Sequence, residues 1–215
     1  MSSVLRAAAL SAAGLFAASS VNAAFVYQSS SRETSASVGG SVVDSESTTA
    51  AGSWYGSASA NTATYTILST QGSNLASTEM TFVGASQISA SAPATLGATS
   101  TATITFLASA SDTVRWIANL AREFSGAGNN AAISLSVLDL TTFNPVLAFT
   151  GPTIGSGSFD VIAGRTYRVN ISATANAAGS TNAVANYNVG FFSTVPAPGA
   201  IALLGLAGLT GRRRR

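Results

Sequence analysis

The chain is 215 residues long, and 47% of its residues are hydrophobic while only 8% are charged. It contains no cysteine, no histidine and no lysine. These absences exclude a disulfide framework, the Ser-His-Asp and Cys-His nucleophile systems, the usual zinc and copper sites, and lysine Schiff-base chemistry. We therefore expect a protein without catalytic residues, without a metal site and without a cofactor.

The formal net charge of +2 comes from the two ends of the chain. Arg6 and the four arginines at 212–215 supply half of the ten basic residues, and the segment between them carries five arginines against eight acidic residues, a net charge of −3. A mildly acidic body has little attraction for phosphate backbones, so we expect no nucleic-acid partner. Its surface has to be covered by small hydroxyl, amide and apolar residues, which lie against a neutral polysaccharide without desolvating charges.

Residues 1–23 have the three parts of a secretory signal peptide. Arg6 is the positive start, and residues 7–18 form an apolar core in which Ser11 is the one polar side chain. Small residues at Val21 and Ala23 predict cleavage between Ala23 and Ala24. The alternative is an amphipathic helix of the mature fold, but such a helix needs a polar face that residues 7–18 do not offer. The sequence therefore predicts an exported protein.

Residues 24–194 are predicted to form the folded body. Short segments of alternating apolar and polar residues recur there between glycine and asparagine turn signals. We expect strands at residues 62–68, 80–89 with a break at Gly84, 102–106, 133–139, 146–149, 159–161, 166–173 and 183–191, and turns at 71–74, 125–130, 141–145, 151–157 and 176–180. The Ser-, Thr- and Gly-rich segment 24–52 is expected to be an edge strand or loose arm followed by a loop.

Segment 112–124 fits two structures. Apolar residues at 114, 117, 121 and 124 fit a helical stripe, whereas those at 114, 116, 118 and 120 fit a strand. The surrounding strands favour the second. With no clear helix elsewhere, we predict an all-β body, an antiparallel β-sandwich or jelly roll.

Aromatic side chains are the first candidates for a binding site. Trp54 and Tyr55 are adjacent in a polar stretch, so they must point to opposite sides if the chain is extended. One of them is then free to stack on a sugar ring, and Trp116 is a third candidate. Packing in the core is the alternative, and it is the default for Trp116.

Carboxylates are the second candidates. Asp44 and Glu46 are two residues apart and would share one strand face, with about 6–7 Å between their Cα atoms. Such a pair suits a glycosidase or a calcium site, although two solvated carboxylates are the simpler interpretation. Asp112, Asp139 and Asp160 could meet at one edge of a sandwich and bind calcium, but turn-capping is the commoner role of such aspartates.

The last 21 residues, 195–215, combine three unlike pieces. Pro196 and Pro198 interrupt the chain, and residues 200–209 are uncharged and apolar. A helix over residues 200–211 would rise about 18 Å against a bilayer core of roughly 30 Å, so it is a marginal span. The third piece is the cluster of terminal arginines: Arg212, Arg213, Arg214 and Arg215. These four residues are expected to act as a membrane stop that stays on the cytoplasmic side and leaves the body outside.

This order of parts resembles the PEP-CTERM sorting signal of bacterial surface and secreted proteins. Family members carry a Val-Pro-Glu-Pro-like motif, a short transmembrane helix and a terminal arginine cluster. The corresponding motif here is Val195, Pro196, Ala197 and Pro198, in which Ala197 replaces the usual Glu. The resemblance implies an exosortase-type enzyme that cuts near the motif and an organism that makes exopolysaccharide. The alternative is a plain anchor that is never cut.

Together these features predict three parts: a signal peptide (1–23), a β-sandwich body (24–194) and a sorting and anchoring tail (195–215). We expect a non-catalytic protein of the cell surface or extracellular matrix that passes through the inner membrane and associates with exopolysaccharide. The alternatives are a carbohydrate-binding module that uses Trp54 or Tyr55 and, less favoured, a carboxylate-dependent glycan hydrolase.

Overall fold

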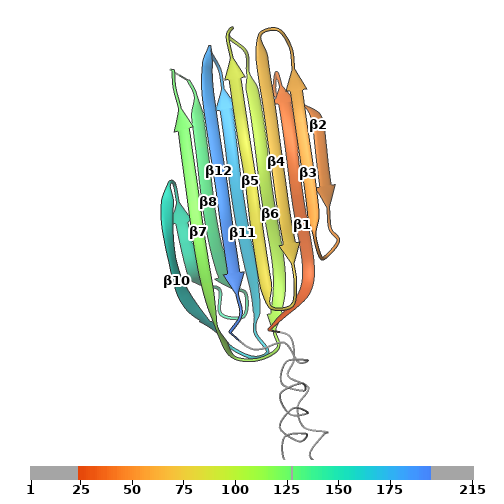
Figure 1. Cartoon of the computed structure of the whole chain (residues 1–215), viewed down its shortest axis with the longest axis vertical. Helices are drawn as coiled ribbons and strands as arrows, with labels where there is room; N and C mark the ends of the chain where they lie inside the picture. Colours follow the sequence, from red (N-terminus) through yellow and green to blue (C-terminus); the bar gives the residue numbers. More distant parts are fainter. Residues whose placement is uncertain (1–23, 127, 195–215) are drawn as a thin grey trace, which may run out of the picture.

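The structure is a computed structural model that describes residues 24–126 and 128–194. Within these residues the chain forms twelve strands and no helix. The strands make two six-stranded sheets that pack face to face, and every hydrogen-bonded pair of neighbours is antiparallel (Figure 1). The predicted all-β antiparallel sandwich is therefore confirmed.

The first sheet has the order β2-β1-β6-β11-β8-β9. Its strands are β1 (Phe25–Val38), β2 (Ser41–Thr48), β6 (Leu96–Ala108), β8 (Asn130–Asp139), β9 (Asn144–Thr150) and β11 (Thr166–Ala177). The second sheet has the order β10-β7-β12-β5-β4-β3. Its strands are β3 (Trp54–Asn61), β4 (Tyr65–Leu75), β5 (Glu79–Ala90), β7 (Asp112–Phe124), β10 (Thr153–Val161) and β12 (Thr181–Phe192).

Alternation of apolar and polar residues decides which face of each strand is buried. On β6, Ala102, Ile104 and Phe106 point into the core, as predicted. Segment 112–124 is a strand, and its buried residues Val114, Ala118 and Leu120 belong to the strand pattern rather than the helical one. One face of the segment is buried against the opposite sheet, and this favours a strand, in which every second side chain points to the same face.

Three sequence expectations were wrong, and in each case a polar or glycine-rich segment forms a strand. Segment 24–52 contains β1, which lies inside the first sheet between β2 and β6, and β2. Residues 71–74 lie within β4, and residues 153–157 of the expected loop belong to β10. Buried positions there are occupied by polar or small side chains, such as Arg32 and Ala36 of β1 and Gln71 of β4, which a search for apolar alternation misses. The expected break at Gly84 is also absent from β5.

Hydroxyl groups join the two sheets across the middle of the sandwich. Ser69 donates to the carbonyl of Thr99 at 2.5 Å, and Ser86 donates to the carbonyl of Ala173 at 2.9 Å. In the opposite direction, Ser100 donates to the carbonyl of Thr70 at 3.2 Å. We call Ser69, Ser86, Ser100 and Tyr187 the hydroxyl belt.

Tyr187 completes the hydroxyl belt. Its hydroxyl lies 2.7 Å from the Ser100 hydroxyl on the opposite sheet. Its ring covers Gly84, where a Cβ atom would collide with the ring, so the glycine makes room for the tyrosine. Burial raises the pKa of Tyr187, which keeps the group neutral as a hydrogen-bonding hydroxyl. The hydroxyl belt therefore sets how closely the sheets approach.

Both ends of the described body are held by the turn between β4 and β5. The Phe25 N–H donates to the carbonyl of Ser77 at 3.0 Å, and the Ser193 N–H donates to the carbonyl of Thr78 at 2.8 Å. In Figure 1 the start of β1 and the end of β12 accordingly lie at the same lower end of the sandwich.

The two predicted targeting segments lie outside the described residues, so the structure neither confirms nor contradicts them. They include the signal peptide up to Ala23, the sorting motif of Val195, Pro196, Ala197 and Pro198, and the membrane stop of Arg212, Arg213, Arg214 and Arg215. No helix long and apolar enough for a membrane span occurs in the part of the chain that the structure describes.

We predict that the Ser100–Tyr187 hydrogen bond stabilises the fold cooperatively. Ser100→Ala should lower the free energy of unfolding by about 1–2 kcal/mol, because it leaves the buried Tyr187 hydroxyl without a partner. Tyr187→Phe should cost less, because the Ser100 hydroxyl still donates to the carbonyl of Thr70. The double variant should lose less stability than the sum of the two single losses, because Tyr187→Phe removes the hydroxyl that Ser100→Ala leaves unpaired. Chemical denaturation measures all three. Additive losses would contradict a direct interaction, and Ser134→Ala on the solvent face serves as the control.

Candidate functional site

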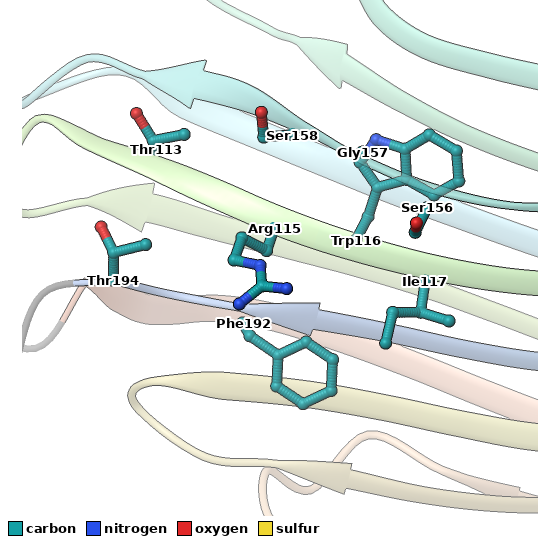
Figure 2. A pocket seen from close by; sticks show the side chains of 9 residues that line it. All are labelled: Thr113, Arg115, Trp116, Ile117, Ser156, Gly157, Ser158, Phe192 and Thr194. Carbon is teal, nitrogen blue, oxygen red and sulfur yellow. The ribbon is translucent and has the colours of Figure 1, made fainter.

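A groove of about 600 Å³ lies on the outer face of the second sheet, where β10, β7 and β12 run side by side. Figure 2 shows its side chains, with the serines of β10 on one side of β7 and the phenylalanine of β12 on the other. The groove is lined by Thr113, Arg115, Trp116, Ile117, Ser156, Gly157, Ser158, Phe192 and Thr194.

Strand register brings these residues together. Arg115 pairs with Phe192 on one side and with Ser158 on the other, so an arginine, an aromatic ring and a hydroxyl form one row across three strands. In the next row Ile117 pairs with Gly190. A Cβ atom at Gly190 would lie 2.7 Å from the Phe192 ring, so the ring lies flat over this glycine. The aromatic ring is thereby held on the outer face beside the groove.

The same face continues toward the other edge of the sheet. A second hollow of about 350 Å³ is lined by Asn119, Asn186, Asn188 and Val83, among others. Asn119 pairs directly with Asn188 across β7 and β12, which sets two amide side chains next to each other. Amides offer both donors and acceptors, so this hollow suits ligands with many hydroxyl groups.

Tyr55 stands at the far end of this face. Its row runs from Tyr55 through Gly72, Val83 and Asn188 to Asn119. The tyrosine side chain is 68% exposed, and Gly72 beside it carries no side chain that would cover the ring. From β3 to β7 the face spans four strand spacings, about 19 Å. We call Tyr55, Asn119, Asn188, Arg115 and Phe192 the outer face.

Trp54 and Tyr55 point to opposite sides of β3, as an extended chain requires. The Trp54 ring lies against Gly56, where a Cβ atom would collide with the indole, and over the Arg32 guanidinium at 5.7 Å. Trp116 packs on Phe149, with 5.1 Å between ring centroids. Of the three aromatic candidates, Tyr55 is therefore the exposed one, whereas Trp54 and Trp116 are partly buried.

Arg32 explains the position of Trp54. Its side chain is fully buried, and its guanidinium donates to the carbonyl groups of Gly52 and Ala50 and to the Ser73 hydroxyl. Burial lowers the pKa of Arg32. The guanidinium holds the connection between β2 and β3, and the indole covers it.

Asp44 and Glu46 share one face of β2, as predicted, but they have structural partners. Asp44 accepts a hydrogen bond from the Ser59 N–H, and Glu46 accepts one from the Ser57 N–H, both at 2.8 Å. These amides lie on the edge of β3, beyond which the second sheet has no further described strand. The two carboxylates therefore cap a strand edge across the two sheets.

The three aspartates proposed for calcium do not all meet, because Asp112 and Asp160 line one hollow and Asp139 does not. Asp112 accepts hydrogen bonds from Ser193 and Thr194, and Asp160 accepts one from Thr113 at 2.7 Å. Burial raises the pKa of Asp112, but these hydrogen bonds outweigh it and hold that pKa below its ordinary value.

Asp139 lies elsewhere, at the end of β8, where it pairs with Arg165 at 2.9 Å and caps the turn at Thr141 and Thr142. Burial raises its pKa, and the hydrogen bonds from Arg165 and the turn more than reverse this, so the pKa is lowered. Among the described residues no group of three or more possible metal ligands comes together.

The geometry of the groove suits binding. Arg115 is the one charged side chain among the described residues that line it. Hydroxyl groups, an aromatic ring and a guanidinium favour a hydroxyl-rich ligand, whereas general acid–base catalysis needs a titratable pair. Neither the protein-family models nor the curated proteins compared with this sequence include a match.

Sequence reasoning named Tyr55 but missed Phe192, Arg115 and the asparagine pair. Alternation in 112–124 and 183–191 does place Arg115, Asn119 and Asn188 on outward positions. The missing information was the order of strands, because β7 and β12 are neighbours in the sheet although Asn119 and Asn188 are 69 positions apart in the chain.

We predict that each carboxylate protects one amide of β3. Asp44→Ala should speed hydrogen exchange at Ser59 and leave Ser57 unchanged, whereas Glu46→Ala should do the reverse, because each change removes the acceptor of one N–H group. Amide exchange followed by NMR measures both, and each variant is the control for the other. Equal acceleration at both amides would show a general loosening of β3 instead.

Proposed function

We propose that this chain is an exported, non-catalytic protein of the cell surface or extracellular matrix, delivered by a leader at residues 1–23 and released at a sorting signal in residues 195–215. The observation that carries the proposal is the order of the tail: Val195-Pro196-Ala197-Pro198, an apolar run and the arginines at 212–215. The processing partner is an exosortase-type enzyme, and the inner membrane holds the tail only transiently.

The arrangement of the body supports this proposal. Phe25 and Ser193 are both held by the turn between β4 and β5, so the leader and the tail join the body at the same end. Cleavage at either junction leaves the twelve strands of the described body intact. The repeated passage of the chain between the two sheets from β5 to β12 also supports the jelly-roll-like form of the sandwich.

A second candidate function is carbohydrate binding, and the outer face favours it. Tyr55 and Phe192 offer aromatic rings, and Asn119, Asn188 and Arg115 supply hydrogen-bonding groups between them. Aromatic faces pack on sugar rings while amides and guanidinium groups bind their hydroxyls. Exopolysaccharide is a ligand that fits both candidate functions, because an exported matrix protein meets it outside the cell.

We predict that both ends are trimmed. Intact-mass spectrometry of the protein recovered from its native host should show a chain that begins at Ala24 and lacks the apolar run and the four arginines. The double variant Pro196→Ala/Pro198→Ala should keep its tail and stay in the membrane fraction, because the motif is lost. Pro93→Ala in the body is the matched control. Recovery of the full-length chain from the cytosol, with leader and arginines intact, would overturn the proposal.

We predict that the outer face binds exopolysaccharide of the producing organism. Tyr55→Ala and Phe192→Ala should each weaken binding about tenfold, as expected when about 1.4 kcal/mol of contact is lost. Phe143→Ala removes an exposed ring from the turn between β8 and β9 and is the control. Affinity electrophoresis or a pull-down on the isolated polysaccharide measures the effect, and unchanged retention of both variants would exclude this face.

A further inference from the structure

The two sheets have four outer strands among the described residues, and three of them are protected. The edge of β3 is capped by Asp44 and Glu46 of β2, and these two acidic residues also place charge on the outer strand β2, which opposes pairing with another chain. On the other side, β9 carries Pro145 next to a break in its register with β8. Proline and irregular pairing are devices that stop a strand edge from pairing with another chain.

The remaining outer strand, β10, carries no such device. Its nine residues, Thr153–Val161, contain no proline and no arginine, and its middle is Gly155-Ser156-Gly157-Ser158. Its single charge, Asp160, is hydrogen-bonded to Thr113 of the neighbouring strand. Ile154 is 84% exposed. No described strand lies beyond β10 in the second sheet, so one row of its backbone groups is available for pairing.

The sequence of β10 is suited to pairing with itself. In an antiparallel pair centred on Gly157, the whole strand overlaps, and Gly155 of one copy faces Phe159 of the other. Ser156 then faces Ser158, and Ile154 faces Asp160, so the two Asp160 carboxylates are kept apart. Opposed like charges would destabilise the pair, and the glycines and serines at its centre let the two backbones approach closely.

We propose that a second copy of this chain adds to the edge of β10, antiparallel and centred on Gly157. The twofold axis then stands perpendicular to the sheet, and the second sheets of both copies join into one continuous sheet. The contact is isologous and uses the free edge of each copy, so assembly stops at the dimer.

The dimer has a consequence for binding that rests on the proposed carbohydrate function. Because the axis is perpendicular to the sheet, both outer faces lie on the same side. The two copies of β7 are three strand spacings apart, about 14 Å, so the grooves are neighbours. A polysaccharide that repeats its unit along one chain then engages both grooves, and the second contact forms at high effective concentration.

Cysteine cross-linking tests the register directly, since the chain has no cysteine of its own. Ser156→Cys and Ser158→Cys are introduced into separately tagged copies of the full chain, mixed in detergent and oxidised. In the proposed pair these positions face each other at about 4.5–5.5 Å between Cα atoms, within reach of a disulfide. Two copies of the same variant meet only diagonally, at about 7–8 Å, beyond that reach.

The expected result is a mixed cross-linked dimer that exceeds the product of either variant alone. The matched control is a mixture of Ser45→Cys and Ser47→Cys on β2, which should give no excess. Equal yields from the mixture, the single variants and the β2 control would overturn the proposal.

A second measurement does not depend on disulfide formation. Ser156→Lys/Ser158→Lys places like charges opposite each other on the solvent face, so the dimer should be lost in sedimentation velocity while the circular dichroism spectrum is unchanged. Ser59→Lys/Asn61→Lys on β3 adds the same charge and should leave the dimer intact. A dimer that persists with the lysines on β10 would overturn the proposal.

The two proposals fail separately. Cross-linking between cysteines at positions 156 and 158, without polysaccharide binding, would refute the carbohydrate function and support the dimer. Polysaccharide binding that depends on Tyr55 and Phe192, without cross-linking, would refute the dimer and support the carbohydrate function.

Discussion

Hydrogen bonds between the two sheets are the constraint on which this sandwich depends. Ser69, Ser86 and Ser100 reach backbone carbonyl groups of the opposite sheet, and Tyr187 joins Ser100. Such contacts need the sheets to be close, and several buried residues beside the belt are accordingly small, among them Ala98, Ala173 and Ala185. The hydroxyl belt thus accounts for a serine-rich sequence in a folded core, and it lies between a large apolar cluster and a smaller, alanine-rich one.

The strands with large apolar residues were predictable from sequence, and those with small residues were not. Ile133, Leu135 and Val137 alternate with serines and mark β8 without ambiguity. In β1 the buried positions are occupied by Arg32, Thr34 and Ala36, which look like the residues of a loop. Whether a polar residue is buried depends on a partner from a distant strand, and a local pattern of residue types does not contain that partner.

The candidate site was less predictable than the fold for a related reason. The two-residue spacing of Asp44 and Glu46 correctly placed them on one face, but their role depends on the backbone amides of β3, which no side-chain motif represents. Opposite orientations of Trp54 and Tyr55 followed from extended geometry alone. Only Arg32 and Gly56 determine that the tryptophan is the covered one. The outer face also depends on the order of strands in the sheet, and that order is determined by contacts between distant parts of the chain.

The position of β12 has a mechanical consequence. This strand is the last of the described body, and it lies between β5 and β7, paired with both over most of its length. A pull on its end, along the strand direction, loads the hydrogen bonds on both sides in shear, so many of them must break at once. A terminal strand at a sheet edge would instead peel away one bond at a time. The body is therefore built to bear tension applied through its carboxyl end.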